Sequence, residues 1–286
     1  MPVETTKGLL ELTRPINAIA AGVLTGIGAF VAGGLLTEPL PATAAIVATV
    51  LGTGAGNAIN DYFDRDVDAI NDPHRPIPRG AVAPRLALAF SLVLFAGAVA
   101  LALTLPWLAI AIALFNLVAL ISYTEVFKGQ PGAGNALVAF LGGSTFLFGA
   151  AAVGNVWPAV VLFLLAALAT FAREVIKDVE DVEGDRKEGL NTLPMAVGER
   201  RALQVAAAVL VVGAIASPAP YLMGLFGLAY VAVVLPAVVI MLYAAWEAFR
   251  DPSAGQRHMK IGMFLAAAAF VVGRLAVEGG SLSLPT

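Results

Sequence analysis

Four long stretches without a charged residue constrain this chain more than any other feature. They lie between Arg14 and Glu38, Arg85 and Glu125, Lys128 and Arg173, and Arg201 and Glu247. A helix needs roughly 20 apolar residues to cross a bilayer, so the first stretch fits one span and each of the others fits two. Only 13% of the 286 residues are charged, against about 25% in soluble domains. We therefore expect an integral membrane protein.

Turn-forming residues near the middle of the three longest stretches divide each of them into two helices. These breaks fall at residues 104–106, 154–158 and 217–220, and each contains proline. With the segment before Asn60 and the last apolar segment, the pattern predicts nine transmembrane helices. They are expected near residues 15–36, 42–62, 84–103, 106–123, 133–153, 157–177, 199–216, 219–246 and 258–277. The predicted fold is thus an all-α integral membrane bundle that forms a single domain over residues 1–286.

The basic residues lie almost entirely on one side of this arrangement. Of the 17 Lys and Arg residues, 16 fall on the side of the N-terminus, and Arg274 within the last helix is the exception. Cytoplasmic loops are enriched in Lys and Arg, so we expect this side to face the cytoplasm of a multi-pass protein of the cell membrane. Nine spans then place the C-terminus outside. The N-terminal segment carries Glu4, Lys7 and Glu11 and shows no cleavable signal.

The acidic residues gather in two short windows at the cytoplasmic ends of the second and sixth predicted helices. Five of the 20 Asp and Glu residues lie between Asp61 and Asp72, and seven lie between Glu174 and Glu188. Steps of three and four place the carboxylates of each window along one side of a helix. The first window carries Asn57, Asn60, Asp61, Asp64 and Asp68, and the second carries Asp178, Asp181 and Asp185 with Arg173 and Lys177 nearby.

Carboxylates stacked at helical spacing repel one another, so positive charge is expected between them. The chain has no Cys and two His, which leaves oxygen ligands and favours a hard cation such as Mg²⁺. Two opposed acidic faces with Mg²⁺ would form a clamp for a diphosphate. The alternative is that both windows are solvated helix ends, but two such windows at the same membrane depth favour a functional site.

A proline-rich loop after the first window adds basic side chains. Arg75 and Arg79 lie among Pro73, Pro76 and Pro78, and arginines held in this way are suited to bidentate phosphate contacts. Tyr123 and Lys128 occupy the next cytoplasmic loop, and Arg14 and Asn17 open the first predicted helix. For Asn17, a role at the site and simple helix packing are both consistent with the sequence.

These motifs resemble those of the UbiA-type intramembrane prenyltransferase superfamily. Its first motif, Asn-Asp-x-x-Asp-x-x-x-Asp, matches residues 60–68, and its second, Asp-x-x-Asp-x-Glu-Gly-Asp, matches residues 178–185. The resemblance covers almost the whole chain and implies a bundle of nine helices around a central cavity. The segments 72–80, 123–128 and 189–194 are most similar to archaeal enzymes that add a second geranylgeranyl chain to geranylgeranylglyceryl phosphate.

The resemblance implies Mg²⁺-dependent transfer of a geranylgeranyl group from its diphosphate to this phosphate-bearing acceptor, a step of ether-lipid synthesis. The expected metal ligands are Asn60, Asp64, Asp68, Asp181 and Asp185. The expected substrate contacts are Arg14, Asn17, Asn57, Arg75, Arg79, Lys128, Arg173 and Lys177, with Tyr123 as a further donor. Asp61, Asp178 and the released diphosphate are all candidates to take the acceptor's hydroxyl proton. The expected partners are the prenyl diphosphate, a polar lipid precursor and membrane lipids, without nucleic acid.

Two other functions fit parts of this pattern. A quinone or haem prenyltransferase would use the same donor chemistry with an aromatic acceptor. A divalent-cation transporter would use the acidic windows as an ion vestibule, but carriers usually place ion sites near the bilayer midplane, whereas these acids lie at one membrane edge. A soluble prenyl synthase also has paired Asp-rich helices, but it would not carry the long uncharged spans.

Overall fold

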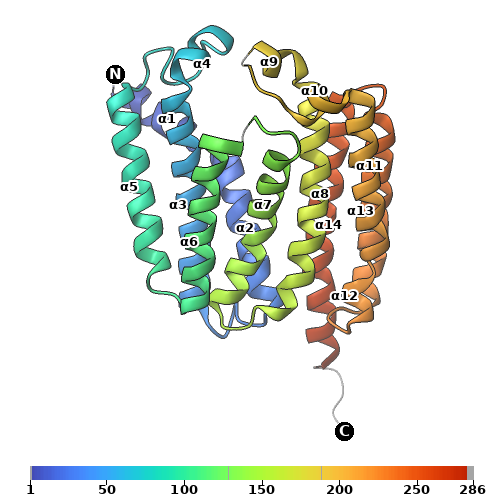
Figure 1. The fold of residues 1–286 in the computed structure, drawn as a ribbon. Coiled ribbons are helices and arrows are strands. Elements are labelled where there is room, and N and C mark those ends of the chain that lie inside the picture. The colour runs from blue at the N-terminus through green and yellow to red at the C-terminus, as the bar shows by residue number, and fades with distance from the viewer. Residues whose placement is uncertain (1, 128, 188, 282–286) are drawn as a thin grey trace.

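The computed structural model describes residues 2–127, 129–187 and 189–281, and every regular element within them is a helix. The long helices run side by side, and α1, α4, α9 and α10 lie at one end of the bundle (Figure 1). The elements are α1 (Pro2–Leu12), α2 (Pro15–Val31), α3 (Pro39–Phe63), α4 (Arg65–Asn71), α5 (Pro84–Ala102), α6 (Trp107–Ser122), the π-helical turn η1 (Tyr123–Phe127), α7 (Ala133–Ala152), α8 (Trp157–Glu180), α9 (Val182–Lys187), α10 (Leu193–Val197), α11 (Glu199–Ala216), α12 (Ala219–Leu222), α13 (Leu228–Glu247) and α14 (Pro252–Ser281).

The prediction of an all-helical, multi-pass membrane fold is confirmed, but the number of nine spans is not. Within the described residues, seven helices are long and apolar enough to cross a membrane, or eight if α1 and α2, which are bent by 47°, form one span. Helix α6 is apolar but has only 16 residues. It ends where Tyr123 begins the π-helical turn, so its apolar run is shorter than a typical span.

Several helix boundaries differ from the predicted ones because of local backbone chemistry. Helix α2 ends at Val31, five residues early, and Gly33 follows with a φ of 85° that continues no helix. The predicted helix 219–246 is broken: α12 ends at Leu222, Gly224 has a φ of 72°, and α13 begins at Leu228. Proline at the first position of α2 and α5 agrees with the predicted starts, whereas α3 begins at Pro39, three residues before its predicted start at residue 42.

Glycine allows α2 and α7 to pack with their backbones in contact. A Cβ atom on Gly149 would lie 1.9 Å from the carbonyl oxygen of Thr25, and one on Gly28 would lie 2.2 Å from that of Phe146. Small residues of this kind let membrane helices approach closely. This contact joins the N-terminal helices to the middle of the bundle.

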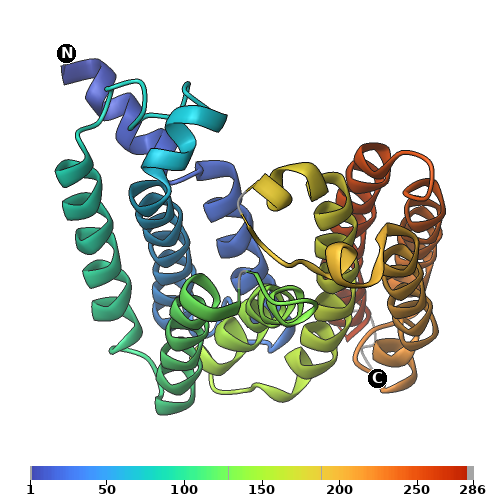
Figure 2. The same ribbon diagram turned by 45° about the horizontal axis from the view of Figure 1, so that its top comes forward.

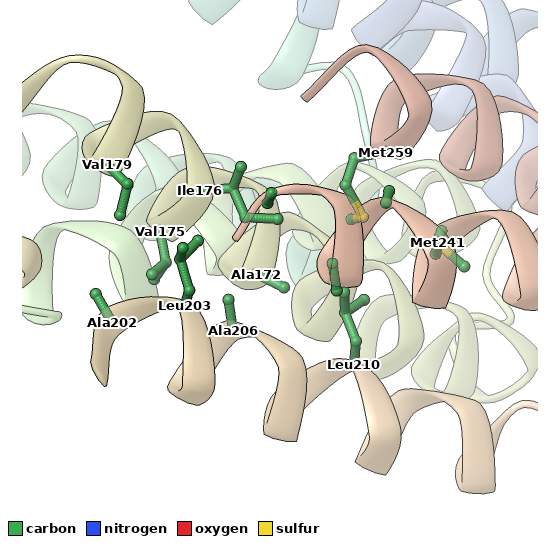
Figure 3. Close-up of a cluster of buried hydrophobic side chains, with 13 residues drawn as sticks. Ala172, Val175, Ile176, Val179, Ala202, Leu203, Ala206, Leu210, Met241 and Met259 are labelled. Atoms are coloured by element: carbon green, nitrogen blue, oxygen red, sulfur yellow. The ribbon is translucent and has the colours of Figure 1, made fainter. Parts of the chain in front are cut away.

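A buried apolar cluster fixes α8 in place through one of its faces. Ala172, Val175, Ile176 and Val179 of α8 form one buried cluster with Ala202, Leu203, Ala206 and Leu210 of α11, and Figure 3 shows Val175 and Val179 directed toward α11. Met241 of α13 and Met259 of α14 complete the cluster. The polar residues of the second acidic window alternate with this face along α8, as expected for an amphipathic helix. The apolar contact with α11 thus orients the acidic face.

Arg274 is the one basic residue that the sequence places away from the cytoplasmic side, within the last predicted helix, and the structure shows a partner for its charge there. Its Nε atom lies 2.9 Å from Oε1 of Glu278 one turn further along α14. Its Nη2 atom lies 3.1 Å from the position that a Cβ on Gly33 would occupy. The guanidinium therefore joins the last turns of α14 to the α2–α3 connection, at the end of the bundle opposite α1 (Figure 1).

Candidate active site

The first acidic window continues the helical path of α3 into α4. Helix α3 ends at Phe63 and α4 begins at Arg65. The backbone N–H of Asp64 donates to the Asn60 carbonyl and that of Asp68 to the Asp64 carbonyl, each at 2.8 Å. These i to i+4 bonds keep Asn60, Asp64 and Asp68 in helical register. The predicted spacing of the three side chains is therefore present.

The second acidic window has the same construction. Helix α8 ends at Glu180 and α9 begins at Val182. The backbone N–H of Asp181 donates to the Lys177 carbonyl at 2.9 Å, and that of Asp185 donates to the Asp181 carbonyl at 3.0 Å. Asp64 and Asp181 thus occupy equivalent junctions between a long and a short helix. Figures 1 and 2 show α4 and α9 at the same end of the bundle.

An ion-pair network binds the first window to two other segments. Arg14 Nη2 lies 2.8 Å from Asp61 Oδ1, and Arg75 Nη1 lies 3.2 Å from the same oxygen. Arg75 Nη1 also lies 2.7 Å from Asp68 Oδ2. The network joins the α1–α2 bend, the end of α3, α4 and the proline-rich loop.

Burial and charge act in opposite directions on this network. Burial raises the pKa of the Asp68 carboxyl above its ordinary value, and the neighbouring Arg75 works against that shift. Burial alone would lower the pKa of Arg75, but the carboxylates of Asp61 and Asp68 outweigh it and raise the pKa. Arg75 therefore remains a cation at the acidic end of α3.

Helix α1 holds the proline-rich loop in position. Arg79 Nη2 lies 2.6 Å from Glu11 Oε2, and Arg79 Nη1 donates to the His74 carbonyl at 2.7 Å. Leu12 is fully buried in a cluster with Ile77 and Val82 of the loop, Ala58 of α3 and Ala87 of α5. The structure thus gives Arg79 two protein partners, whereas its predicted contact with substrate stays untested.

The second window is supported from α7 and by its own basic residues. Asn135 Nδ2 on α7 donates to Asp178 Oδ2 on α8 at 2.7 Å. Lys177 Nζ lies 3.7 Å from Asp181 Oδ2, and both side chains are about half exposed. Arg173, a predicted substrate contact, pairs directly with Glu174.

Carboxylates of both acidic windows act on Tyr123. Burial, followed by the negative charges of Glu174, Asp178, Asp185 and Asp64, raises the pKa of its hydroxyl to about 12. Asp64 belongs to the first window and the other three acids belong to the second, so carboxylates of both windows affect one phenol. Tyr123 therefore stays protonated at neutral pH and is able to donate a hydrogen bond.

The oxygen donors of the two windows fit a hard cation for which the protein supplies only some of the ligands. Among the described residues, no group of three or more His, Cys, Asp or Glu is arranged to enclose a metal. Mg²⁺ usually binds through one or two carboxylates and completes its shell with water and phosphate. Asn60 and Asp64 on one side and Asp181 and Asp185 on the other fit this pattern, in which diphosphate supplies the remaining ligands.

The remaining predicted residues have different surroundings. Asn57 Nδ2 donates to the Thr13 carbonyl at 2.9 Å, so it supports the bend between α1 and α2. Asn17 is exposed at the start of α2. Lys128 lies outside the described residues.

The sequence interpretation missed Asn135, Glu11 and Glu174. Asn135 was detectable in principle, since a polar side chain in an apolar membrane stretch is costly unless it has a partner. Its partner, Asp178, is 43 residues away, and helical spacing within one window gives no information about such a contact. Glu11 and Glu174 resemble ordinary charges at a membrane edge until the fold places Arg79 and Arg173 beside them.

Comparison with known proteins agrees with this architecture. A solved structure of a digeranylgeranylglyceryl phosphate synthase in membranes is similar over 96% of this chain and 99% of its own, with a TM-score of 0.82 and 34% identity. The structure of a UbiA homolog from Archaeoglobus fulgidus bound to GPP and Mg²⁺ is similar over 92% and 98% of the two chains, with a TM-score of 0.71 and 19% identity.

Sequence comparison gives the same grouping. The digeranylgeranylglyceryl phosphate synthase of Natronomonas pharaonis is 65% identical over 276 residues, which cover 96% of this chain and 99% of the relative. The model of the UbiA prenyltransferase family matches residues 21–268. The chain therefore belongs to the UbiA prenyltransferase family.

Proposed function

We propose that this chain transfers a geranylgeranyl group from geranylgeranyl diphosphate to geranylgeranylglyceryl phosphate with Mg²⁺. The observation that carries the proposal is the placement of two acidic windows at one end of a membrane bundle, close enough that Asp64 and Asp178 both act on Tyr123. The similarity to digeranylgeranylglyceryl phosphate synthases over nearly the whole chain supports the choice of donor and acceptor.

The acidic windows and their basic neighbours would bind the donor diphosphate. We assign metal binding to Asn60, Asp64, Asp181 and Asp185, and we assign Asp68, which was also a predicted ligand, to Arg75, whose Nη1 atom lies 2.7 Å from Asp68 Oδ2. Bound Mg²⁺ supplies positive charge that makes diphosphate a better leaving group. Arg75 and Lys177 are placed among these carboxylates, and Tyr123 carries a protonated hydroxyl, so these three groups are suited to donate to phosphate oxygens.

The reaction requires that the acceptor hydroxyl reach the prenyl carbon before water does. The carbon–oxygen bond to diphosphate breaks, and the acceptor oxygen forms a new bond to the same carbon. The lipid-embedded helices supply an apolar surface for the prenyl chain and exclude water, which favours transfer over hydrolysis. Arg14, near the acidic end of α3, is our candidate for the acceptor phosphate.

We propose nine spans, with the N-terminus and the acidic windows in the cytoplasm and the C-terminus outside. The placement of α1 and the last turns of α14 at opposite ends of the bundle supports an odd number of crossings (Figure 1). Trp107 and Trp157 are exposed where α6 and α8 begin, and Trp246 is exposed where α13 ends. Tryptophan is enriched at both membrane interfaces, which agrees with these helices spanning the bilayer.

An acceptor panel tests the proposed function. Purified protein is given labelled geranylgeranyl diphosphate with either geranylgeranylglyceryl phosphate or an aromatic acid, in Mg²⁺ and in EDTA. We expect product with the glycerol phosphate only, and only with Mg²⁺. Product with the aromatic acid alone would keep the donor chemistry and replace the acceptor. Metal flux into proteoliposomes in the absence of donor would instead support a transporter.

A further inference from the structure

Two aspartates, Asp61 and Asp178, are candidates to take the acceptor's proton, and a contact with Asn135 distinguishes Asp178 from Asp61. Asn135 is 7% exposed, and its Nδ2 atom donates to Asp178 Oδ2 at 2.7 Å. This is the only side-chain hydrogen bond of Asp178 within the described part of the chain. A buried amide directed at a carboxylate of the site fixes the orientation of that carboxylate.

The start of α7 is also pressed against the turn that carries Tyr123. A Cβ on Gly134 would lie 2.7 Å from the Phe127 carbonyl oxygen and 3.6 Å from Tyr123 Cε2. The adjacent residue, Asn135, is therefore held by backbone packing on one side and by Asp178 on the other. This rigidity allows Asn135 to place one carboxylate oxygen accurately.

Asp61 has a different environment. Its Oδ1 atom accepts from two guanidinium groups, those of Arg14 and Arg75, and its side chain is 6% exposed. Both arginines contact one oxygen of this carboxylate and stabilise its charged form, whereas the side-chain partner of Asp178 is a neutral amide. A carboxylate paired with two cations gives up that stabilisation when it takes a proton, so Asp178 is better suited to accept one.

We infer that Asp178 accepts the acceptor's hydroxyl proton and that Asn135 is its positioning residue. This rests on the proposed function and assigns a role within it. As the acceptor oxygen bonds to the prenyl carbon and the bond to diphosphate breaks, the hydroxyl proton passes to Asp178 Oδ1, while Oδ2 remains bonded to Asn135. The proton later leaves to water, and the carboxylate is regenerated.

The test compares Asn135→Ala, Asp178→Asn and the double variant with wild type. Asn116→Ala is the matched control, because Asn116 also makes an interhelical hydrogen bond to α7, with Ser144 Oγ at 2.9 Å, but lies outside the acidic windows. Transfer to geranylgeranylglyceryl phosphate and hydrolysis of geranylgeranyl diphosphate are measured together, with the KM of the donor. Thermal unfolding of each variant in detergent reports on folding.

We expect Asp178→Asn to lower the kcat of transfer by roughly 100-fold or more, and Asn135→Ala to lower it by about tenfold. The KM of the donor should stay near the wild-type value in both, and a larger share of the donor should be hydrolysed. The double variant should be no slower than Asp178→Asn, because Asn135 acts through Asp178. Asn116→Ala should keep the wild-type ratio of transfer to hydrolysis at a similar unfolding temperature.

Three results would overturn the inference while the wild-type enzyme still transfers the prenyl group. They are normal transfer by Asp178→Asn, the same transfer-to-hydrolysis ratio in Asn135→Ala and Asn116→Ala, and multiplied defects in the double variant. If the wild-type enzyme forms no product from this donor and acceptor, the proposed function fails and the assignment of Asp178 falls with it.

Discussion

Arg14 Nη2 lies 2.8 Å from Asp61 Oδ1, and this contact joins the bend between α1 and α2 to the acidic end of α3. Arg14 is the one non-glycine residue with a positive φ, 46°, among the described residues. Such a backbone conformation costs free energy and needs support from its surroundings. The buried carboxylate of Asp61 provides that support and also holds Arg75.

Replacing Asp61 with Ala should therefore destabilise the protein. Both arginines would lose a partly buried charged partner, with an expected cost of about 1–3 kcal/mol. The apparent unfolding temperature in detergent should fall. Asp66→Ala is the control, because Asp66 is 86% exposed and lies 3.7 Å from Arg65, a pair worth about 0–1 kcal/mol. Equal unfolding temperatures for the two variants would contradict the role of Asp61.

Exchanging the charges of Arg79 and Glu11 should preserve much of the activity that reversing one charge alone would lose. We expect Arg79→Glu alone to lower activity, since two acidic side chains would then repel and α1 would no longer hold the loop. The double variant Glu11→Arg, Arg79→Glu should recover much of that activity, as measured by kcat and by the KM of the donor. If Arg79 instead binds phosphate, the double variant should stay as impaired as Arg79→Glu.

The junction aspartates should be essential for turnover but not for folding. Asp181 has a half-exposed side chain, and Asp64 is partly buried. Asp64→Ala and Asp181→Ala should each abolish measurable transfer, because a diphosphate held from one side only would not be neutralised. Their unfolding temperatures should stay near the wild-type value. Full activity in either purified variant would argue against the clamp.

The close contact of α2 and α7 leads to a stability prediction. Gly149→Ala should destabilise by about 1–3 kcal/mol or more, because its Cβ would lie 1.9 Å from the Thr25 carbonyl oxygen. Gly52→Ala in α3 is the matched control, since the nearest atom to its Cβ, Ala98 Cβ, would be 3.8 Å away. That variant should be neutral or slightly stabilising. The unfolding temperature of Gly149→Ala should lie well below that of Gly52→Ala, and equal values would contradict the close contact of α2 and α7.

Much of the fold could be predicted because membrane spans depend on long uncharged runs and on local breakers. Proline at residues 15 and 84 marked two helix starts correctly, whereas Pro39 begins α3 three residues before the predicted start. The break between α12 and α13 was missed because Gly224 adopts a positive φ of 72°, which the apolar composition around this residue does not indicate. The bounds of α6 were predicted to within one residue, 106–123 against Trp107–Ser122, whereas the π-helical turn that begins at Tyr123 was missed because its hydrogen bonding has no simple sequence pattern.

The acidic windows could be predicted because helical spacing is a local property, and the structure keeps Asn60, Asp64 and Asp68 in register. Partners across the fold could not be predicted in the same way. The sequence gives no direct indication that Arg75 pairs with Asp68, or that Asn135 bonds to Asp178. These contacts depend on how helices distant in sequence pack, and they decide which charges are available to substrate.

The central claim is that one diphosphate is held between the two acidic windows. A structure of the protein with Mn²⁺ in place of Mg²⁺ and a thio analogue of geranylgeranyl diphosphate, with manganese located by anomalous scattering, tests it directly. We expect metal at the oxygens of Asn60 and Asp64 on one side and of Asp181 and Asp185 on the other, with the diphosphate between them. Metal at only one window, or diphosphate bound elsewhere in the bundle, would contradict the account.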